Sequence, residues 1–248
     1  MYLCDVNISC HSLDNLLSVS GPPKLVVTVN AEAIVRAQTD NRLKSIINEN
    51  CSTIDGQIPL WLYKLKYRNM SIDKISGSDL IYTLPGYAEK KGYRVFLLGG
   101  KEDSNKGAVM NLKELFPKLD IDGFSPEFRP YPFPDFINNQ IIGRIKEFRP
   151  DILFVGFGMG KQEFWENDYY SELEELGVKL IIGCGGSFDF ASGKIKRAPR
   201  FVQKVGLEGI WRLLREFKWF RIKRILLSTK VFYYYLLDLK NSDSVFVK

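Results

Sequence analysis

The sequence has very little of the two residue types that most often carry metal or acid–base chemistry. It contains one histidine, His11, and its four cysteines (Cys4, Cys10, Cys51 and Cys184) form no Cys-x-x-Cys pair. Histidine-based acid–base or triad chemistry is therefore disfavoured, as are a zinc site and a disulfide framework. This cysteine usage fits a reducing cytosol best.

Long hydrophobic runs are also missing. No stretch reaches about 18 uninterrupted apolar residues, the usual minimum for a spanning helix. The opening residues, MYLCDVNISCHS, hold no basic segment followed by an apolar run, so no signal peptide is predicted.

Acidic residues are scarce in one late segment. Between Lys194 and Lys230, twelve Lys or Arg residues face two acidic ones, so this segment carries +10 and the remainder of the chain −4. This asymmetry indicates an anionic partner for the basic segment.

Short β-branched apolar runs alternate with helical patterns up to residue 193. Such runs are typical of strands buried on both faces of a parallel sheet. Strands are predicted at 24–30, 51–55, 93–98, 151–156 and 178–183. Helices are predicted at 31–48, 59–67, 78–91, 103–116, 133–148 and 161–176, with Pro85 kinking or dividing the third. The alternation predicts an α/β fold with a doubly wound, Rossmann-like, mostly parallel sheet.

A different pattern begins at Arg197. Ile210, Leu213, Leu214 and Phe217 follow helical spacing, and Lys or Arg occupies every third position from 212 to 224. This pattern predicts an amphipathic helical segment with a broad basic face. We therefore expect an α/β catalytic domain over residues 1–196 and a basic, membrane-associating appendage over residues 197–248.

Each predicted strand ends in polar or glycine-rich sequence. Ligands bind beyond the carboxyl ends of the strands in an open α/β sheet. Glycine lets the backbone approach a phosphate, and helix N-termini supply N–H donors. We expect these turns to converge on one nucleotide-type pocket. Its candidate residues include Gly56, Gln57, Gly99, Gly158, Gly186 and Asp189.

Near-matches to known motifs fail on spacing or position. The run Gly156–Lys161 lacks the third glycine spacing of the dinucleotide fingerprint and follows the fourth strand instead of the first. Gly99-Gly100-Lys101 lacks the P-loop spacing. The Asp120-Ile121-Asp122 run resembles the Asp-x-Asp metal site of many sugar-nucleotide transferases, but its surroundings favour a solvated turn. No metal site is predicted.

Carboxylates remain the candidates for proton transfer. Asp55 lies between a predicted strand and a Gly-Gln turn, where a carboxylate can face a cleft and accept a proton. It can equally cap that turn or the helix region after it, and position alone does not decide. Asp189, between Phe188 and Phe190, is either a second functional acid or a loop anchor, and the anchor is favoured.

Several short motifs occur in collinear order over about residues 25–224. They are Thr28-Val-Asn30, Asp55-Gly56-x-x-Pro59, Gly77-Ser-Asp79-Leu80, Val95-Phe-Leu-Leu-Gly99-Gly100, Gly156-x-Gly158-x-x-Lys161-Gln162-Glu163, Gly185-Gly186-x-Phe188-Asp189-Phe190-x-x-Gly193, Arg197-Ala198-Pro199, Gly206-Leu207-Glu208 and Trp211-Arg212-Leu213. Together they resemble the WecB/TagA/CpsF glycosyltransferases of bacterial surface-polysaccharide synthesis, which include the N-acetylmannosaminyltransferases of teichoic acid linkage-unit assembly. One departure is Gly160, where that family usually has proline.

The resemblance implies an inverting transfer without a metal or other cofactor. The donor would be a UDP-N-acetylhexosamine, with N-acetylmannosamine the best candidate, and the acceptor N-acetylglucosamine on undecaprenyl diphosphate. Asp55 would be the catalytic base, and Thr28, Asn30, Gln162, Glu163 and Arg197 would contact the substrates. The enzyme would work peripherally on the inner face of the cell membrane, in cell-wall or surface glycopolymer synthesis.

Without a metal, the charge of the leaving UDP must be neutralised by cationic side chains. Arg212, Arg215, Arg221 and Arg224 are the candidates, because guanidinium groups bind phosphate oxygens bidentately. Contact with anionic lipid is the other explanation for them, and the two roles can coexist.

Other interpretations remain open at this point. A family member could use another UDP-hexose or a hexuronate in exopolysaccharide synthesis. A nucleic-acid-binding α/β protein would explain the basic segment but not the polar turns, so no nucleic-acid partner is expected. A nicotinamide-dependent oxidoreductase shares the architecture but lacks the early fingerprint. The oligomeric state is open, with a homo-oligomer among the alternatives.

Overall fold

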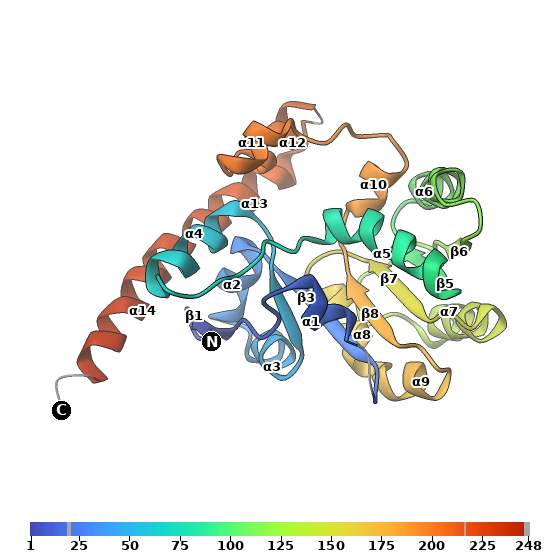
Figure 1. The fold of residues 1–248 in the computed structure, drawn as a ribbon, viewed down its shortest axis with the longest axis horizontal. Coiled ribbons are helices and arrows are strands. Elements are labelled where there is room, and N and C mark those ends of the chain that lie inside the picture. The colour runs from blue at the N-terminus through green and yellow to red at the C-terminus, as the bar shows by residue number, and fades with distance from the viewer. Residues whose placement is uncertain (19–20, 216, 246–248) are drawn as a thin grey trace. The chain divides into compact units, whose positions relative to one another are not determined.

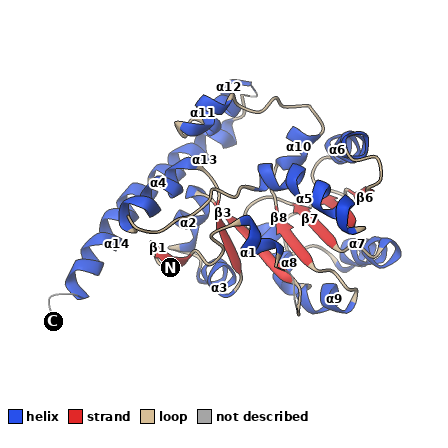
Figure 2. Cartoon of the chain, in the orientation of Figure 1, coloured by secondary structure: helices blue, strands red, loops and turns tan. Residues whose placement is uncertain are grey.

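The main sheet has six strands in the order β4-β3-β8-β7-β5-β6 (Figure 2). Their bounds are β3 (Lys24–Val29), β4 (Cys51–Ile54), β5 (Arg94–Gly99), β6 (Asp120–Phe124), β7 (Ile152–Gly156) and β8 (Leu180–Gly183). The pairings from β3 across to β6 are all parallel. All the predicted strands are present, and the mixed α/β architecture with a parallel sheet is confirmed.

This computed structural model describes residues 1–18, 21–215 and 217–245. The chain divides into two units. Unit 1 holds residues 1–15, 28–76 and 197–248, and unit 2 holds residues 16–27 and 77–196. Strand β3 passes from unit 2 into unit 1 at Thr28. The described residues between 197 and 245 therefore pack with the first part of the chain, while the predicted functional division after residue 196 stays a prediction.

In unit 2, helices cover both faces of the sheet (Figure 1). Helices α5 (Gly77–Lys91), α6 (Glu102–Leu115) and α10 (Ser187–Ala191) lie on one face, where α10 contacts both of the others. Helices α7 (Asp135–Phe148), α8 (Lys161–Asp168) and α9 (Tyr170–Glu175) lie on the other, over a core that includes Trp165. The apolar residues of β5 and β7 are buried because both sheet faces are covered, which explains their continuous apolar runs.

Unit 1 combines its strands with helices from both ends of the chain. An antiparallel pair, β1 (Tyr2–Leu3) and β2 (Val6–Asn7), opens it, and α1 (Leu13–Leu17) passes from it into unit 2. Its other helices are α2 (Ala31–Ala37), α3 (Asn41–Glu49), α4 (Gln57–Lys66), α11 (Arg200–Lys204), α12 (Glu208–Arg215), α13 (Trp219–Thr229) and α14 (Val231–Val245). Both α13 and α14 pack against α2. The side chain of Asp238 on α14 accepts hydrogen bonds from Lys66 Nζ at 2.6 Å and from the Cys4 amide at 2.9 Å.

Several helix predictions differ from the structure in detail. The predicted helix 31–48 is two helices, because Asp40 caps α3 by accepting a hydrogen bond from the Leu43 amide at 3.0 Å. The predicted helix 161–176 also divides, at Tyr169. By contrast, α5 runs undivided through the buried Pro85, so the predicted division there is wrong. Within the described residues, no helix combines the length and the apolar character needed to cross a bilayer.

Candidate active site

Unit 1 contains a pocket of about 380 Å³, within the usual size range of small-molecule sites. Its walls come from separate stretches of the chain. The start of α2 contributes Asn30 to Glu32, the β4–α4 turn contributes Asp55 to Pro59, and Lys74 contributes alone. The remaining wall is formed by residues of α11 to α14 and their connections, between Gln203 and Phe232. The basic C-terminal segment therefore helps to build the pocket itself.

The β4–α4 turn places Asp55 on the pocket wall. The Asp55 amide donates to the Val29 carbonyl at 2.9 Å, which continues the pairing of β3 with β4 by one residue. Gly56 follows with φ of +97°, a backbone conformation that side-chain-bearing residues rarely adopt, and it caps α4. The chain thereby turns away directly after Asp55, whose half-buried carboxylate lines the pocket beside Gln57. This position suits a proton acceptor.

The first strand contributes one pocket residue and one buried residue. Asn30 lines the pocket, and its side-chain oxygen caps α2 by accepting from the Ala33 amide at 3.0 Å. Its amide nitrogen is therefore the group that it can offer to a ligand. Thr28 is 4% exposed and is not among the residues that line the pocket.

Four cationic side chains line the same pocket: Lys74, Arg212, Arg221 and Arg224. The carboxylates of Glu32, Asp55 and Glu208 line it as well, so among the described residues the cations exceed the carboxylates by one. A pocket with this balance favours an anionic ligand. Of the remaining predicted arginines, Arg215 is exposed and stacks on the Trp211 ring at 4.7 Å. Arg197 is half-buried, and neither of these two residues is part of the pocket wall.

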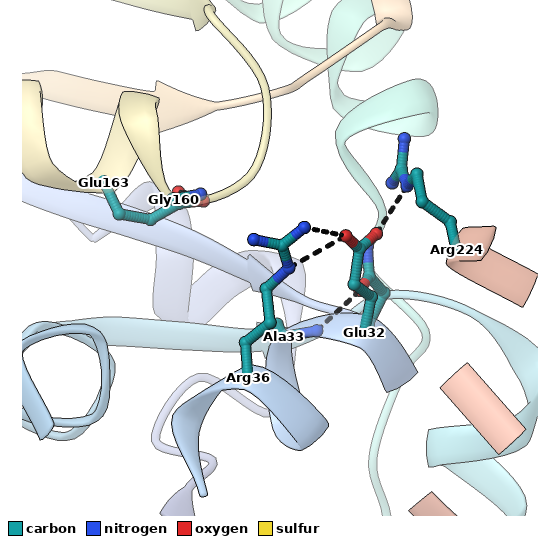
Figure 3. Close-up of polar contacts among 7 residues, drawn as sticks. Glu32, Ala33, Arg36, Gly160, Glu163 and Arg224 are labelled. Atoms are coloured by element: carbon teal, nitrogen blue, oxygen red, sulfur yellow. Dashed lines mark hydrogen bonds and ion pairs between the residues drawn. The ribbon is translucent and has the colours of Figure 1, made fainter. Parts of the chain in front are cut away.

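Lys74 and Glu32 are among the pocket residues that sequence reasoning missed. Lys74 lies beside β4 because the Ile75 amide donates to the Ile54 carbonyl at 2.9 Å, extending the sheet by one bridge. Glu32 is 3% exposed, and its carboxylate meets Arg36 and Arg224 (Figure 3). The i, i+4 spacing of Glu32 and Arg36 was readable in the sequence. The contact with Arg224 was not, because it joins residues 192 positions apart.

In unit 2, Gln162 and Glu163 connect the turns after β7 and β8. The Gln162 side-chain oxygen accepts from the Gly158 amide at 3.1 Å and from the Gly185 amide at 3.0 Å. Its amide nitrogen donates to Glu163 at 2.9 Å, and Glu163 in turn accepts from the Gly160 amide at 2.6 Å. Both side chains are almost fully buried. Their geometry is that of residues that fix two loops.

The glycines of these turns fall into two groups. A Cβ at Gly99 would lie 2.7 Å from the Phe157 ring, and one at Gly100 2.8 Å from the Phe188 ring. A Cβ at Gly183 would likewise lie 2.6 Å from the side-chain nitrogen of Gln162. These glycines make room for protein side chains. Gly158 and Gly160 have positive φ and nothing within 4 Å of an added Cβ, so the close approach to a phosphate fits this turn best.

Other predicted positions in unit 2 have structural partners. Asp189, on α10, accepts a hydrogen bond from the Ser104 hydroxyl on α6 at 2.8 Å, so it joins two helices, and Gly186 is exposed. Asp120 pairs with Arg94 at 2.9 Å at an exposed position of β6, so the Asp-x-Asp run is solvated as predicted but belongs to a strand. No group of three His, Cys, Asp or Glu side chains suited to a metal occurs among the described residues.

One buried carboxyl group in unit 2 has no obvious role. Glu166 lies on α8, and within residues 1–18, 21–215 and 217–245 neither of its oxygens has a hydrogen-bond partner. Burial, with a smaller effect of Glu163, raises the pKa of Glu166 well above its usual value. Burial, followed by the proximity of Glu166, likewise raises the pKa of Cys184.

Comparison with known proteins adds a relationship over almost the whole chain. Residues 1–244 match the model of the glycosyl transferase WecG/TagA/CpsF family. The N-acetylglucosaminyldiphosphoundecaprenol N-acetyl-beta-D-mannosaminyltransferase of Bacillus subtilis (strain 168) is 29% identical over 228 residues, which cover 90% of this chain and 83% of that protein. The protein of the same name from Staphylococcus aureus (strain MRSA252) is 28% identical over 209 residues, 84% of this chain and 78% of that protein.

Proposed function

Because the chain belongs to the WecG/TagA/CpsF family of glycosyltransferases, we propose that it transfers N-acetylmannosamine from a UDP donor to N-acetylglucosaminyl diphosphoundecaprenol. The names of its relatives give the transferred sugar and the acceptor. The observation that carries the proposal is the unit 1 pocket, which combines the Asp55 carboxylate with an excess of cationic side chains. The family assignment disfavours the nucleic-acid-binding and nicotinamide-dependent alternatives.

The proposed reaction is a single displacement with inversion. The acceptor hydroxyl oxygen attacks the anomeric carbon of the donor while Asp55 accepts the hydroxyl proton. The bond from the anomeric carbon to the UDP oxygen breaks on the opposite face, and UDP leaves with the electron pair. Asp55 suits the role of base because it lies on a turn at the pocket wall, directly after a strand that fixes its backbone.

Cationic side chains would stabilise the departing diphosphate. Arg212, Arg221 and Arg224 line the pocket together with Lys74, and guanidinium groups suit phosphate oxygens in geometry and charge. This supply of charge supports a reaction that needs no metal ion. Arg215 lies outside the pocket wall on an exposed part of α12, which suits contact with anionic lipid instead.

The substrate contacts expected of the unit 2 turns stay a separate prediction. The Gly158–Gly160 turn is open and precedes the N-terminus of α8, an arrangement that suits a phosphate. Gln162 and Glu163 fix the turns after β7 and β8, Gly99 ends β5, and Asp189 lies on α10, directly after Gly186 and Ser187; contact of these residues with a substrate stays a prediction.

The basic C-terminal segment would bring the enzyme to the inner face of the membrane, where its lipid-linked acceptor resides. Leu214, Phe217 and Trp219 are each more than 60% exposed, beside the exposed Arg215. Exposed apolar side chains flanked by cations are typical of interfacial binding.

Substitution of three exposed residues tests the membrane contact without dismantling the pocket. We expect Leu214→Ser/Phe217→Ser/Trp219→Ser to lower binding to anionic vesicles at least tenfold in a flotation assay, while activity on a water-soluble acceptor analogue persists. Unchanged flotation would contradict the membrane contact. Deletion of residues 197–248 is a poorer test, since it also removes part of the pocket wall.

The reaction itself is tested by a screen of UDP-sugars against a lipid-diphosphate N-acetylglucosamine acceptor, with and without EDTA. We expect transfer from UDP-N-acetylmannosamine, unaffected by EDTA. Preference for another UDP-hexose or a hexuronate would revise the donor and keep the reaction class. Loss of transfer with EDTA would reject metal independence, and no transfer from any UDP-sugar would reject the proposed function.

A further inference from the structure

Glu32 is a pocket carboxylate for which the proposed reaction has no use. It lies in the first turn of α2, two residues after Asn30, and its residue is 3% exposed. A carboxylate so deeply buried requires compensating partners. Its partners are two arginines from different parts of unit 1.

The first partner, Arg36, lies one turn further along α2. Its Nε and Nη2 atoms approach one Glu32 oxygen, at 2.9 and 2.8 Å. The second partner, Arg224, belongs to α13, and its Nε donates to the other Glu32 oxygen at 2.5 Å. Figure 3 shows Glu32 between the two guanidinium groups. Among these three residues, Glu32 and Arg224 line the pocket, whereas Arg36 is not part of its wall.

The contact with Arg224 uses one edge of its guanidinium group. The contact with Glu32 is made by Nε, and Figure 3 shows one η nitrogen directed away from the carboxylate and the other on the same side as Nε, so the edge between the two η nitrogens is not the one that Glu32 uses. An arginine side chain loses considerable rotamer freedom when it is fixed, and its planar fork gains most from a partner when it is already oriented. The Arg224 side chain is 45% exposed, so packing alone does not fix it.

We propose that Glu32 is a positioning residue that holds Arg224 at the pocket wall, with the η edge of the guanidinium group available to an anionic ligand. Arg36 is the other partner that a carboxylate so deeply buried requires. The identification of the anion as the diphosphate of the UDP donor or of the lipid acceptor rests on the proposed function. The positioning itself does not.

Calorimetric titration with inorganic diphosphate and with UDP tests this role without requiring turnover. We expect Glu32→Gln to weaken diphosphate binding about tenfold, because one charge-assisted hydrogen bond that orders the binding group is lost. Arg224→Gln should weaken it by at least as much. The double variant should bind no more weakly than Arg224→Gln, since Glu32 acts through that arginine. UDP should show the same ranking if it occupies the pocket.

Two control variants separate positioning from a merely structural role. Arg36→Gln removes the partner outside the pocket and should change diphosphate affinity less than threefold. Asp238→Asn removes another carboxylate that fastens the C-terminal segment, away from the pocket. It should lower the Tm and leave diphosphate affinity unchanged.

Three results would overturn the proposal. They are unchanged affinity in Glu32→Gln, a full additional loss when Glu32→Gln is combined with Arg224→Gln, and no diphosphate binding by the wild-type protein. Failure of the proposed function is a separate outcome, in which diphosphate binds with the expected ranking but no UDP-sugar supports transfer.

Discussion

Polar and glycine-rich turns follow the strands of both units, yet the two units use them differently. In unit 1 the turn after β4 presents Asp55 to a pocket, and cations from distant segments line the same hollow. In unit 2 most of the corresponding residues contact other parts of the protein instead. Gln162 connects two turns, Asp189 joins α10 to α6, and Gly99 and Gly100 accommodate phenylalanine rings. The same sequence pattern therefore has two uses: in unit 1 it places a reactive side chain on a pocket wall, and in unit 2 it builds turns.

The two aspartates Asp55 and Asp189 test this comparison with the largest expected effect. Asp55→Asn should lower the transfer rate about 10²–10⁴-fold, the range for loss of a general base, with little change in Tm. Asp189→Asn should lower activity far less, because its hydrogen bond with Ser104 is structural. Steady-state kinetics and thermal melts of both variants measure this. Retained transfer in Asp55→Asn would remove Asp55 from the role of base.

Gly160 sharpens the comparison within unit 2. Its φ of +90° is incompatible with proline, and its amide donates to Glu163, a bond that proline cannot make. Gly160→Pro should therefore destabilise the protein by about 2–4 kcal/mol. The control is Gly143, on an exposed part of α7 with open space around it, where Gly143→Ala should stabilise by about 0.5–1 kcal/mol.

Denaturant titration measures both glycine variants. A proline tolerated at position 160 without loss of stability would show that the turn adopts another backbone conformation, the one expected of relatives with proline there. UDP affinity should fall in Gly160→Pro if this turn approaches a donor phosphate, whereas Gly143→Ala should leave it unchanged.

Substitution of Glu166 should change the stability less than Gly160→Pro does, and the change should depend on pH. Because the pKa of Glu166 is raised in the folded protein, the native state holds a proton that the unfolded chain releases at its ordinary value near 4.3. Its contribution is fully present below that ordinary value and is lost as pH rises through the raised folded value. Glu166→Leu should remove this slope and stabilise the protein by about 1–3 kcal/mol at pH 8. Stability curves that keep the wild-type slope would contradict the assignment.

The sequence predicted the parts of the fold that local patterns determine. Continuous apolar runs identified β5 and β7 because both faces of those strands are buried. Strand β6 (DIDGF) was missed, because an edge strand with exposed aspartates carries no such run. The break between α2 and α3 depends on one capping residue, Asp40, inside an otherwise helical pattern.

The residues of the candidate site likewise divide into those that local sequence patterns indicate and those that depend on tertiary packing. Asp55 was predicted from its position after a strand, although its catalytic role stays a prediction. Lys74 and Glu32 were missed because their places in the pocket depend on a single bridge to β4 and on a contact with α13. Periodicity alone does not distinguish Arg221, on the pocket wall, from Arg215, which stacks on Trp211. The difference arises from how the C-terminal helices pack.

The pocket wall includes residues as far along the chain as Phe232. During synthesis, a ribosome must therefore have translated and released the chain as far as Phe232 before this binding site exists as a whole. Nascent or prematurely terminated chains would carry the Asp55 turn without the arginines that accompany it. Such fragments would not bind a diphosphate, so binding would require synthesis of the C-terminal helices that carry these arginines.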